Sequence, residues 1–378
     1  PWNFFQGILT EESQILSIDQ VVIDMNTNTP ALLQRISALG ASDLFIIAGR
    51  PLSYRLNDQV VQDDSERLLP DDTRQLIEDI YHLAGERDMD TLNQTGDDDF
   101  SFALPGISRF RVSAYKQRGS LAAVIRIITF TLPSPKEMGI PDNIIQLSAL
   151  NKGLVLVTGP AGSGKSTTLS CIIDHINHTQ EKHIITLEDP LEYLHRHDKS
   201  IVSQREINTD TESYVAALRA ALRQSPDVIL LGEMRDFETI QVAMTAAETG
   251  HLVFSTLHTI GTANTIDRII DVFPANQQRQ IAVQLSMVLQ AVICQQLVPS
   301  VDGKLVPAFE IMTINPAIRN MIRDGKVPQI DGILYSSANN DNLMAMDTCL
   351  AKLFRSGQIT KETALSFAAN PEMLGRKI

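Results

Sequence analysis

The chain has 378 residues, of which 43% are hydrophobic, enough for two domains that each bury a core. Its formal net charge of −13 argues against a protein that coats nucleic acid, because neutralising phosphates requires clustered lysine and arginine. No apolar run approaches the roughly 18 residues of a membrane span, and three widely spaced cysteines indicate neither a disulfide framework nor a zinc site but a reducing compartment.

The N-terminal third is predicted to be a small α+β domain. Residues 43–58 predict two short strands with a turn between them, and residues 70–84 predict a helix that Asp71 or Asp72 caps. Residues 110–115 alternate between apolar and polar side chains with the period of a strand.

Beyond residue 130 the pattern changes. Residues 131–141 carry three prolines and a glycine, the composition of a linker. Short, continuous apolar runs then alternate with helical segments, which predicts a mainly parallel sheet covered on both faces. We therefore predict an α/β chain with an unassigned extension (1–28), a first domain (29–130), a linker (131–142) and a second domain (143–378). The four strand-like runs are GLVLVT at 153–158, HIITLE at 183–188, DVILLG at 227–232 and HLVFST at 251–256.

Residues 159–166, GPAGSGKS, match the GxxxxGKS pattern of a phosphate-binding loop between a predicted strand and a predicted helix. Glycines let consecutive N–H groups turn toward phosphate oxygens, and the helix N-terminus adds partial positive charge. Lys165 is expected to reach the outer phosphates in a catalytic role, and the Ser166 hydroxyl to join the shell of Mg²⁺. We therefore predict a site for ATP or ADP with Mg²⁺; a glycine-rich turn without a ligand is the alternative. The residues expected to bind the nucleotide are Gly159, Pro160, Ala161, Gly162, Ser163, Gly164, Lys165, Ser166 and Thr167.

Acidic side chains follow two of the predicted strands. In doubly wound sheets ligands bind beyond the carboxyl ends of the strands. Glu188 is therefore a candidate to orient or deprotonate the water that attacks the γ-phosphate, with Asp189 beside the nucleotide. Gly232 stands where an aspartate often binds the Mg²⁺ water, so Glu233 is expected to hold the ion through water. Solvated strand-end acids or helix caps are the alternative for both glutamates.

Two histidines bracket the fourth predicted strand. His258 is predicted to sense the γ-phosphate as part of the catalytic set, and His251 is a second candidate for nucleotide binding. For each, a packed and hydrogen-bonded histidine is the alternative.

Together, these segments resemble a known family. Four segments are similar to motifs of secretion and pilus ATPases: GPAGSGKSTT to the phosphate loop, TLEDPLEY to the Asp box, ILLGEMRD to Walker B, and HLVFSTLHT to the His box. Three further segments resemble the PilT-type retraction ATPases of type IV pili: residues 98–128, AIRNMIRDGK at 317–326, and ANPEML near the end. The resemblance spans about residues 30–375. One departure is that Ala161 and Ser166 stand where the family often has threonine, and either should still allow Mg-ATP to bind.

The resemblance implies a PAS-like N-terminal domain, a RecA-like ATPase domain with a C-terminal helical part, and a homohexameric ring. It implies that Glu188 is the catalytic glutamate and Glu233 the Walker B acid. It also implies that arginines of the first domain reach a nucleotide. Such an arginine stabilises transition-state charge and couples hydrolysis to domain position. Arg111 and Arg126 match those positions best, Arg109 and Arg118 stay open, and a solvent-facing Arg111 is the alternative.

Residues 317–326 also predict an ordinary amphipathic helix that Gly325 ends in the left-handed conformation. The resemblance adds an interaction surface, with Arg319, Asn320 and Arg323 facing outward.

The function implied by the resemblance is an ATPase motor that hydrolyses ATP to ADP and phosphate and powers pilus retraction in twitching motility. Its partners would be an inner-membrane platform protein and possibly other pilus motor ATPases, and it would be cytoplasmic, peripheral at the inner face of the cytoplasmic membrane. Extension ATPases normally carry a tetracysteine zinc module and an extra N-terminal domain, whereas this chain has no CxxC pair and no room for that domain.

Three alternatives stay open. A related type II/IV secretion or conjugation ATPase shares the same motifs. A nucleic-acid-stimulated RecA-like motor is disfavoured by the acidic charge and by the lack of a basic, aromatic strip. A regulatory ATP-binding scaffold without turnover is disfavoured by the pair Glu188 and Glu233.

Overall fold

The structure is a computed structural model that describes residues 28–378 apart from positions 57–58, 129, 131 and 338–339. The chain contains sheets and helices of an α/β protein and divides into two compact units between Ile127 and Ile128. Each unit is described by itself. Among the described residues no helix is long and apolar enough to cross a membrane.

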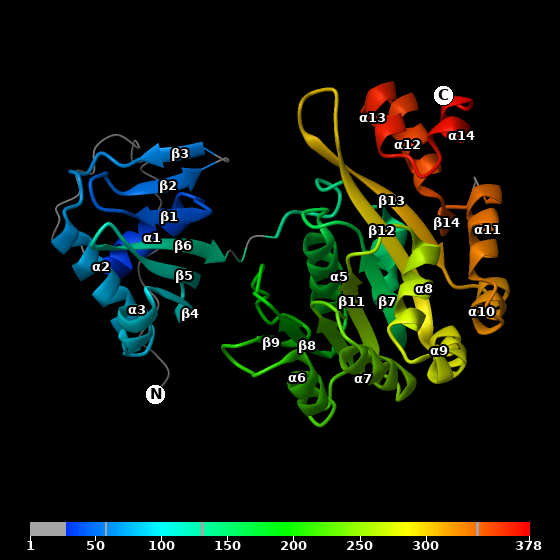
Figure 1. Cartoon of the computed structure of the whole chain (residues 1–378), viewed down its shortest axis with the longest axis horizontal. Helices are drawn as coiled ribbons and strands as arrows, with labels where there is room; N and C mark the ends of the chain where they lie inside the picture. The colour runs from blue at the N-terminus through cyan, green and yellow to red at the C-terminus, as the bar shows by residue number, and fades with distance from the viewer. Residues whose placement is uncertain (1–27, 57–58, 129, 131, 338–339) are drawn as a thin grey trace, which may run out of the picture. The chain divides into compact units, whose positions relative to one another are not determined.

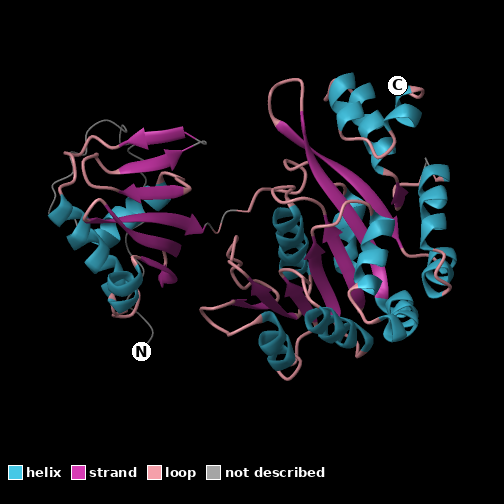
Figure 2. Ribbon diagram, viewed as in Figure 1, coloured by secondary structure: helices cyan, strands magenta, loops and turns pink. Residues whose placement is uncertain are grey.

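The first unit contains a six-stranded sheet in the order β3-β2-β1-β6-β5-β4 (Figures 1 and 2). Strand β1 pairs antiparallel with both β2 and β6. Alternate residues of β5, such as Phe110 and Val112, share one core with Ile36 of α1 and Ile77 of α2. The elements are α1 Thr29–Ala38, β1 Asp43–Ile46, β2 Ser53–Leu56, β3 Gln59–Gln62, α2 Pro70–Leu83, α3 Asp90–Thr95, β4 Asp97–Leu104, β5 Ser108–Gln117 and β6 Ser120–Ile128.

The strands and the helix predicted in this unit are confirmed, with one correction at the start of α2. The N-cap position is Leu69, and the helix begins at Pro70, whose missing N–H suits the first turn. Asp72 acts from the third helical position, where its carboxylate accepts a hydrogen bond from the Leu69 N–H at 2.7 Å.

The second unit contains an eight-stranded sheet in the order β14-β13-β12-β7-β11-β10-β8-β9. The ladders from β12 to β9 are parallel, and β13 and β14 are antiparallel additions at one edge. All six residues of β7 are buried because the sheet is covered on both faces. Leu154 and Leu156 face a core shared with α6–α9, whereas Val155 and Val157 face a core shared with α5 and α12.

The four predicted strands are confirmed as β7, β8, β10 and β11. The strands of this unit are β7 Gly153–Thr158, β8 His183–Glu188, β9 Ile201–Glu206, β10 Val228–Leu231, β11 Leu252–Leu257, β12 Leu289–Pro299, β13 Leu305–Thr313 and β14 Leu343–Met344. Its helices are α4 Asp142–Ile145, α5 Lys165–Thr179, α6 Tyr214–Ala221, α7 Phe237–Glu248, α8 Thr262–Asp271, α9 Ala275–Val288, α10 Pro316–Arg323, α11 Ile330–Ser336, α12 Met346–Arg355, α13 Lys361–Ser366 and α14 Pro371–Gly375, with short 3₁₀ turns at Gln146–Ala149 and Val327–Gln329.

Much of the segment predicted as a linker packs against the second unit. Leu132 and Ile140 lie in the same apolar cluster as α5, and Ile140 is only 5% exposed. The Pro133 carbonyl accepts a hydrogen bond from the Cys171 thiol at 3.6 Å. Burial of its apolar side chains therefore fixes this segment, although its proline content is that of a spacer.

The motif at 317–326 forms the predicted amphipathic helix α10, and Gly325 follows it with φ +69°. The prediction that Arg319 faces outward is wrong. Its guanidinium is half-buried and donates to the carbonyls of Ser286 and Met287 at the end of α9, where a cation satisfies free carbonyl groups. Asn320 and Arg323 are exposed, and Arg323 donates to Asn320 Oδ1 at 2.9 Å.

The C-terminal helices are held by one buried carboxylate, which yields a testable prediction. Asp347 of α12 is 3% exposed and accepts hydrogen bonds from the N–H groups of Ala369 and Asn370 at 2.7 and 3.1 Å. Replacing it with alanine should destabilise the packing of α14 by about 2–3 kcal/mol, because hydrogen bonds to a charged acceptor are lost. We expect a lower urea concentration for release of the C-terminal helices, measured by limited proteolysis. Asp341→Ala, which removes an exposed ion pair to Lys352, should change that concentration little.

Candidate functional site

The loop that joins β7 to α5 is shaped by its glycines. Gly159, Gly162 and Gly164 have φ values of +137°, +73° and +84°, a region that side chains disfavour. A Cβ atom on Gly159 would lie 2.1 Å from the carbonyl oxygen of Gln295, so only glycine fits there. Gly164 is the N-cap of α5, and its carbonyl accepts the Thr168 N–H at 3.0 Å. The loop thus ends at a helix N-terminus, where N–H groups can receive an anion.

Lys165 is the first residue of α5 and is 8% exposed. Its Nζ donates to the carbonyls of Gly159 and Pro160 at 3.0 and 2.8 Å. Burial lowers the pKa of the Lys165 ammonium, and the nearby carboxylates of Glu192 and Glu233 act in the opposite direction. Neutral carbonyls bind an ammonium more weakly than phosphate oxygens do, so this side chain suits an anionic ligand.

The next two residues of α5 contact the segment that follows β8. Ser166 Oγ donates to Glu192 Oε1 at 2.9 Å, and Thr167 Oγ1 lies 3.1 Å from the Tyr193 hydroxyl. Hydroxyl and carboxylate oxygens are the ligands that Mg²⁺ prefers. Ser166 and Glu192 therefore fit a Mg²⁺ ion held together with phosphate. Glu192 and Tyr193 were not predicted as site residues, although both lie in TLEDPLEY at 186–193.

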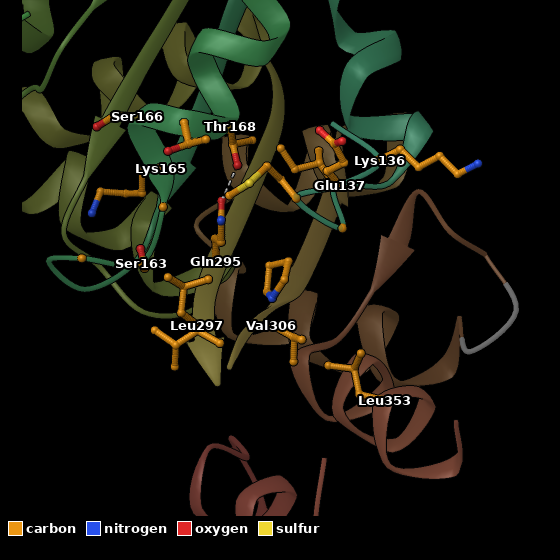
Figure 3. Close-up of a pocket in the computed structure, with 18 of the residues that line it drawn as sticks. Lys136, Glu137, Ser163, Lys165, Ser166, Thr168, Gln295, Leu297, Val306 and Leu353 are labelled. Carbon is orange, nitrogen blue, oxygen red and sulfur yellow. Dashed lines mark hydrogen bonds between the residues drawn. The ribbon is translucent and has the colours of Figure 1, made fainter. Parts of the chain in front are cut away.

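A cavity of about 810 Å³ opens beside the loop (Figure 3). One side is polar, with Ser166, Thr168 and Glu192 among its residues. The opposite side is apolar and includes Leu297 of β12 and Leu353 of α12. A cavity with a phosphate-binding end and an apolar wall fits a nucleotide, whose phosphates and base require those two surroundings.

Strands β8, β10 and β11 are parallel neighbours, so their carboxyl ends lie along one edge of the sheet. Glu188 is the last residue of β8, and Gln204 Nε2 lies 3.5 Å from its Oε1. Burial raises the pKa of the Glu188 carboxyl above its usual range. Beyond β10, the Glu233 carboxylate lies 2.6 Å from Arg235 Nε and 3.5 Å from His258 Nε2. The structure therefore brings Glu233 and His258 together, and their roles stay predictions.

Tyr214 occupies the space in front of Gly232. A Cβ atom on Gly232 would lie 2.7 Å from the Tyr214 hydroxyl and 3.2 Å from the Leu187 carbonyl oxygen, so a side chain here would require its neighbours to shift. Burial, followed by the charges of Glu233, Asp189 and Glu188, raises the pKa of Tyr214. Tyr214 is thus close enough to feel the charge of three carboxylates, two of which the sequence pattern assigned to catalysis.

The close approach at Gly232 predicts a coupled pair of substitutions. Gly232→Ala should destabilise the protein by about 1–3 kcal/mol, since the new methyl group overlaps the Tyr214 hydroxyl. Adding Tyr214→Phe should restore part of that loss in thermal unfolding. Gly332→Ala is the matched control, because a Cβ atom there meets nothing within 4 Å. Additive effects of Gly232→Ala and Tyr214→Phe would contradict the proposed overlap.

The structure does not bring His251 to this edge. His251 precedes β11, so it lies at the opposite end of the strand from His258, and six strand residues span about 20 Å. Its Nδ1 lies 2.9 Å from the Ala246 carbonyl and 3.2 Å from Thr249 Oγ1. The hydrogen-bonded structural histidine, which was the alternative, describes it better.

Arg111 and Arg126 lie in the first unit. Arg126 Nε donates to the buried Asp43 carboxylate at 3.0 Å, and Arg111 is half-buried on β5 opposite Ser101. Their contact with a nucleotide stays a prediction.

The described residues contain no group of three or more histidines, cysteines and acids that could hold a metal ion by themselves. The three cysteines are buried and free. A Mg²⁺ ion here would therefore be shared between phosphate oxygens and the oxygens of Ser166 and Glu192.

Comparison with known proteins decides the family. A sequence profile of type II/IV secretion system proteins matches residues 20–326. The chain belongs to this family. The resemblance to PilT-type ATPases is also confirmed: the type IV pilus retraction ATPase PilT of Pseudomonas aeruginosa is 44% identical over 88% of this chain and 96% of its own.

Another relative and a solved structure are similar to this chain over most of their length. The type IV pilus ATPase PilU of Pseudomonas aeruginosa is 38% identical over 89% of this chain and 87% of its own. A crystal structure of the retraction motor PilT with bound ADP superposes with a TM-score of 0.82 at 45% identity, covering 91% of this chain and 98% of that one.

Proposed function

We propose that this chain is a motor ATPase that hydrolyses ATP to ADP and phosphate to retract type IV pili. The supporting observation is that a complete phosphate loop and two strand-end glutamates meet at one sheet edge, in a chain that spans 96% of PilT at 44% identity. The proposal includes a first unit that is PAS-like, a second unit that is RecA-like, and assembly as a homohexameric ring.

The chain's own residues divide the chemistry between them. Loop N–H groups and Lys165 hold the phosphates, and Lys165 exchanges its carbonyl partners for phosphate oxygens. Mg²⁺, when bound, supplies positive charge that offsets the charge of the phosphates. Ser166 would hold the ion directly, and Glu233 would hold it through water.

Glu188 accepts the proton of the attacking water, and its raised pKa brings it closer to working pH as a base. His258 senses the γ-phosphate, and its contact with Glu233 at 3.5 Å links the γ-phosphate to the residue that would hold Mg²⁺ through water. Arg111 and Arg126 add charge to the γ-phosphate from the first domain of a neighbouring chain.

The motor acts at the inner face of the cytoplasmic membrane through a platform protein of that membrane, with other pilus motor ATPases as further partners. Asn320 and Arg323, the exposed part of α10, belong to its interaction surface.

Two experiments test this function. The purified chain should hydrolyse ATP, and Lys165→Ala should abolish turnover, because the loop loses its only side-chain cation. Deletion of the gene in the native cell should leave surplus surface pili and no twitching. Bald cells would indicate an extension motor, and normal pili with a secretion defect would indicate a secretion ATPase. DotB of Legionella pneumophila, 29% identical with a TM-score of 0.74, is an ATPase with a similar fold.

A further inference from the structure

A glutamine on β12 supports the phosphate loop from the neighbouring strand. Gln295 is 3% exposed and lines the cavity beside the loop. Its backbone carbonyl oxygen packs against Gly159. Its side-chain Nε2 lies 2.8 Å from the position that a Cβ atom on Gly164 would take. Its Oε1 accepts the Thr168 hydroxyl at 2.7 Å (Figure 3). One residue therefore contacts the start and the end of the loop and the first turn of α5.

The amide is unusual for its surroundings. The three residues before Gln295 on β12 are buried and apolar, and β12 pairs with β7 up to the register of Cys294 with Thr158. A buried amide is unfavourable unless its groups are hydrogen-bonded. Thr168 satisfies the oxygen, but Nε2 donates to no described residue. Among the described residues the N–H₂ group of Gln295 therefore has no acceptor, and it lies beside Gly164, at the level of the helix N-terminus, in a residue that lines the cavity.

We infer that Gln295 is a nucleotide-binding residue whose Nε2 donates a hydrogen bond to the phosphate chain. This rests on the proposed function. The Thr168 hydroxyl orients the amide by bonding Oε1, so that the nitrogen faces the same space as the loop N–H groups. Its closeness to Gly164 places it at the phosphate end of the cavity. Leu297, two residues further along the same face of β12, lines the apolar wall. Strand β12 therefore contacts the phosphates of the nucleotide through Gln295 and its base end through Leu297.

The alternative is that Gln295 only braces the loop. Two substitutions separate the roles. Gln295→Glu keeps an oxygen acceptor for Thr168 but replaces the donor with a negative oxygen that faces the phosphates. Gln295→Leu removes both groups at similar volume. Gln296→Glu is the matched control, because it places the same charge one residue along on the opposite face of β12.

The test is the dissociation constant of ADP with Mg²⁺, measured by calorimetry on the full chain. We expect about tenfold weaker binding for Gln295→Leu and about a hundredfold for Gln295→Glu, while Gln296→Glu stays within about twofold. The inference is overturned if both folded Gln295 variants bind ADP as the wild type does while Lys165→Ala does not bind. A wild type that binds no ADP would instead contradict the proposed function.

If neither Gln295 variant folds, Thr168→Val decides. It removes only the bond that orients the amide, and should weaken ADP binding by about threefold or more. A folded Thr168→Val variant with an unchanged dissociation constant would then overturn the inference.

Discussion

Replacing Glu188 with glutamine should lower ATP turnover by about 10²–10⁴, the usual contribution of a general base. Glu188 is the last residue of β8, at the edge of the sheet where the parallel strands β10, β11 and β7 also end, and the phosphate loop follows β7. An amide keeps its size and its contact with Gln204 but cannot accept the proton of water. Steady-state phosphate release measures the effect.

The loss of turnover can be assigned to the hydrolysis step only if the variant still binds the nucleotide. The ADP dissociation constant of Glu188→Gln should stay within about twofold, since the loop and Lys165 hold the phosphates. Glu181→Gln is the control, because it removes an exposed carboxylate two residues before β8 begins, at the opposite end of the strand. Full turnover in Glu188→Gln would eliminate Glu188 as the base.

The raised pKa of Glu188 predicts a pH dependence of stability with a defined sign. Because burial raises the pKa in the folded state, folding favours the protonated form. Its stabilisation is complete below the unfolded pKa of about 4.3 and is lost as pH rises through the folded pKa. Glu188→Gln should therefore melt at least as high as the wild type at pH 8, with a smaller advantage at pH 4. Lower stability of the variant at pH 8 would contradict a desolvated carboxylate.

The local parts of the site could be predicted because each lies in one short segment. A buried apolar run, a glycine pattern and a helix follow each other in β7, the loop and α5, so the sequence contains all the information needed. Gln295 and Arg319 could not be found in this way. Gln295 meets Thr168 across 127 positions, and Arg319 reaches Met287 across 32. Such contacts depend on strand order and helix packing, which periodicity does not reveal.

His251 shows a different failure. The rule that ligands bind beyond the carboxyl ends of strands selected Glu188, Glu233 and His258 correctly by position. His251 precedes its strand, so the same rule excludes it, and the structure places it at the amino end of β11. Both histidines flank the same predicted strand, and the prediction treated its two ends alike. The direction of the strand follows from the sequence and already distinguishes them.

Neutralising Arg111 and Arg126 together should reduce ATP turnover by about 10³ or more, the effect of removing arginines that stabilise γ-phosphate charge. The first unit should remain folded, because Asp43 keeps a second cation, Arg55, at 3.4 Å when Arg126 is replaced. Arg74→Gln on α2 is the matched control for loss of charge, since Arg74 is exposed and its ion-pair partner is the partly exposed Glu78. Unchanged turnover in Arg111→Gln/Arg126→Gln would show that these two arginines of the first domain do not contribute to ATP hydrolysis.

Mixing variants determines whether the arginines act between chains. A Lys165→Ala chain has a disabled loop but intact arginines, and an Arg111→Gln/Arg126→Gln chain has the reverse. If a site takes its loop from one chain and its arginines from the next, rings assembled from both inactive chains regain turnover, because some interfaces then combine an intact loop with intact arginines. If each chain completes its own site, no mixture regains activity. Recovery that depends on the mixing ratio would therefore make the ring, rather than the single chain, the catalytic unit, and would connect each hydrolysis event to the movement of a neighbouring domain.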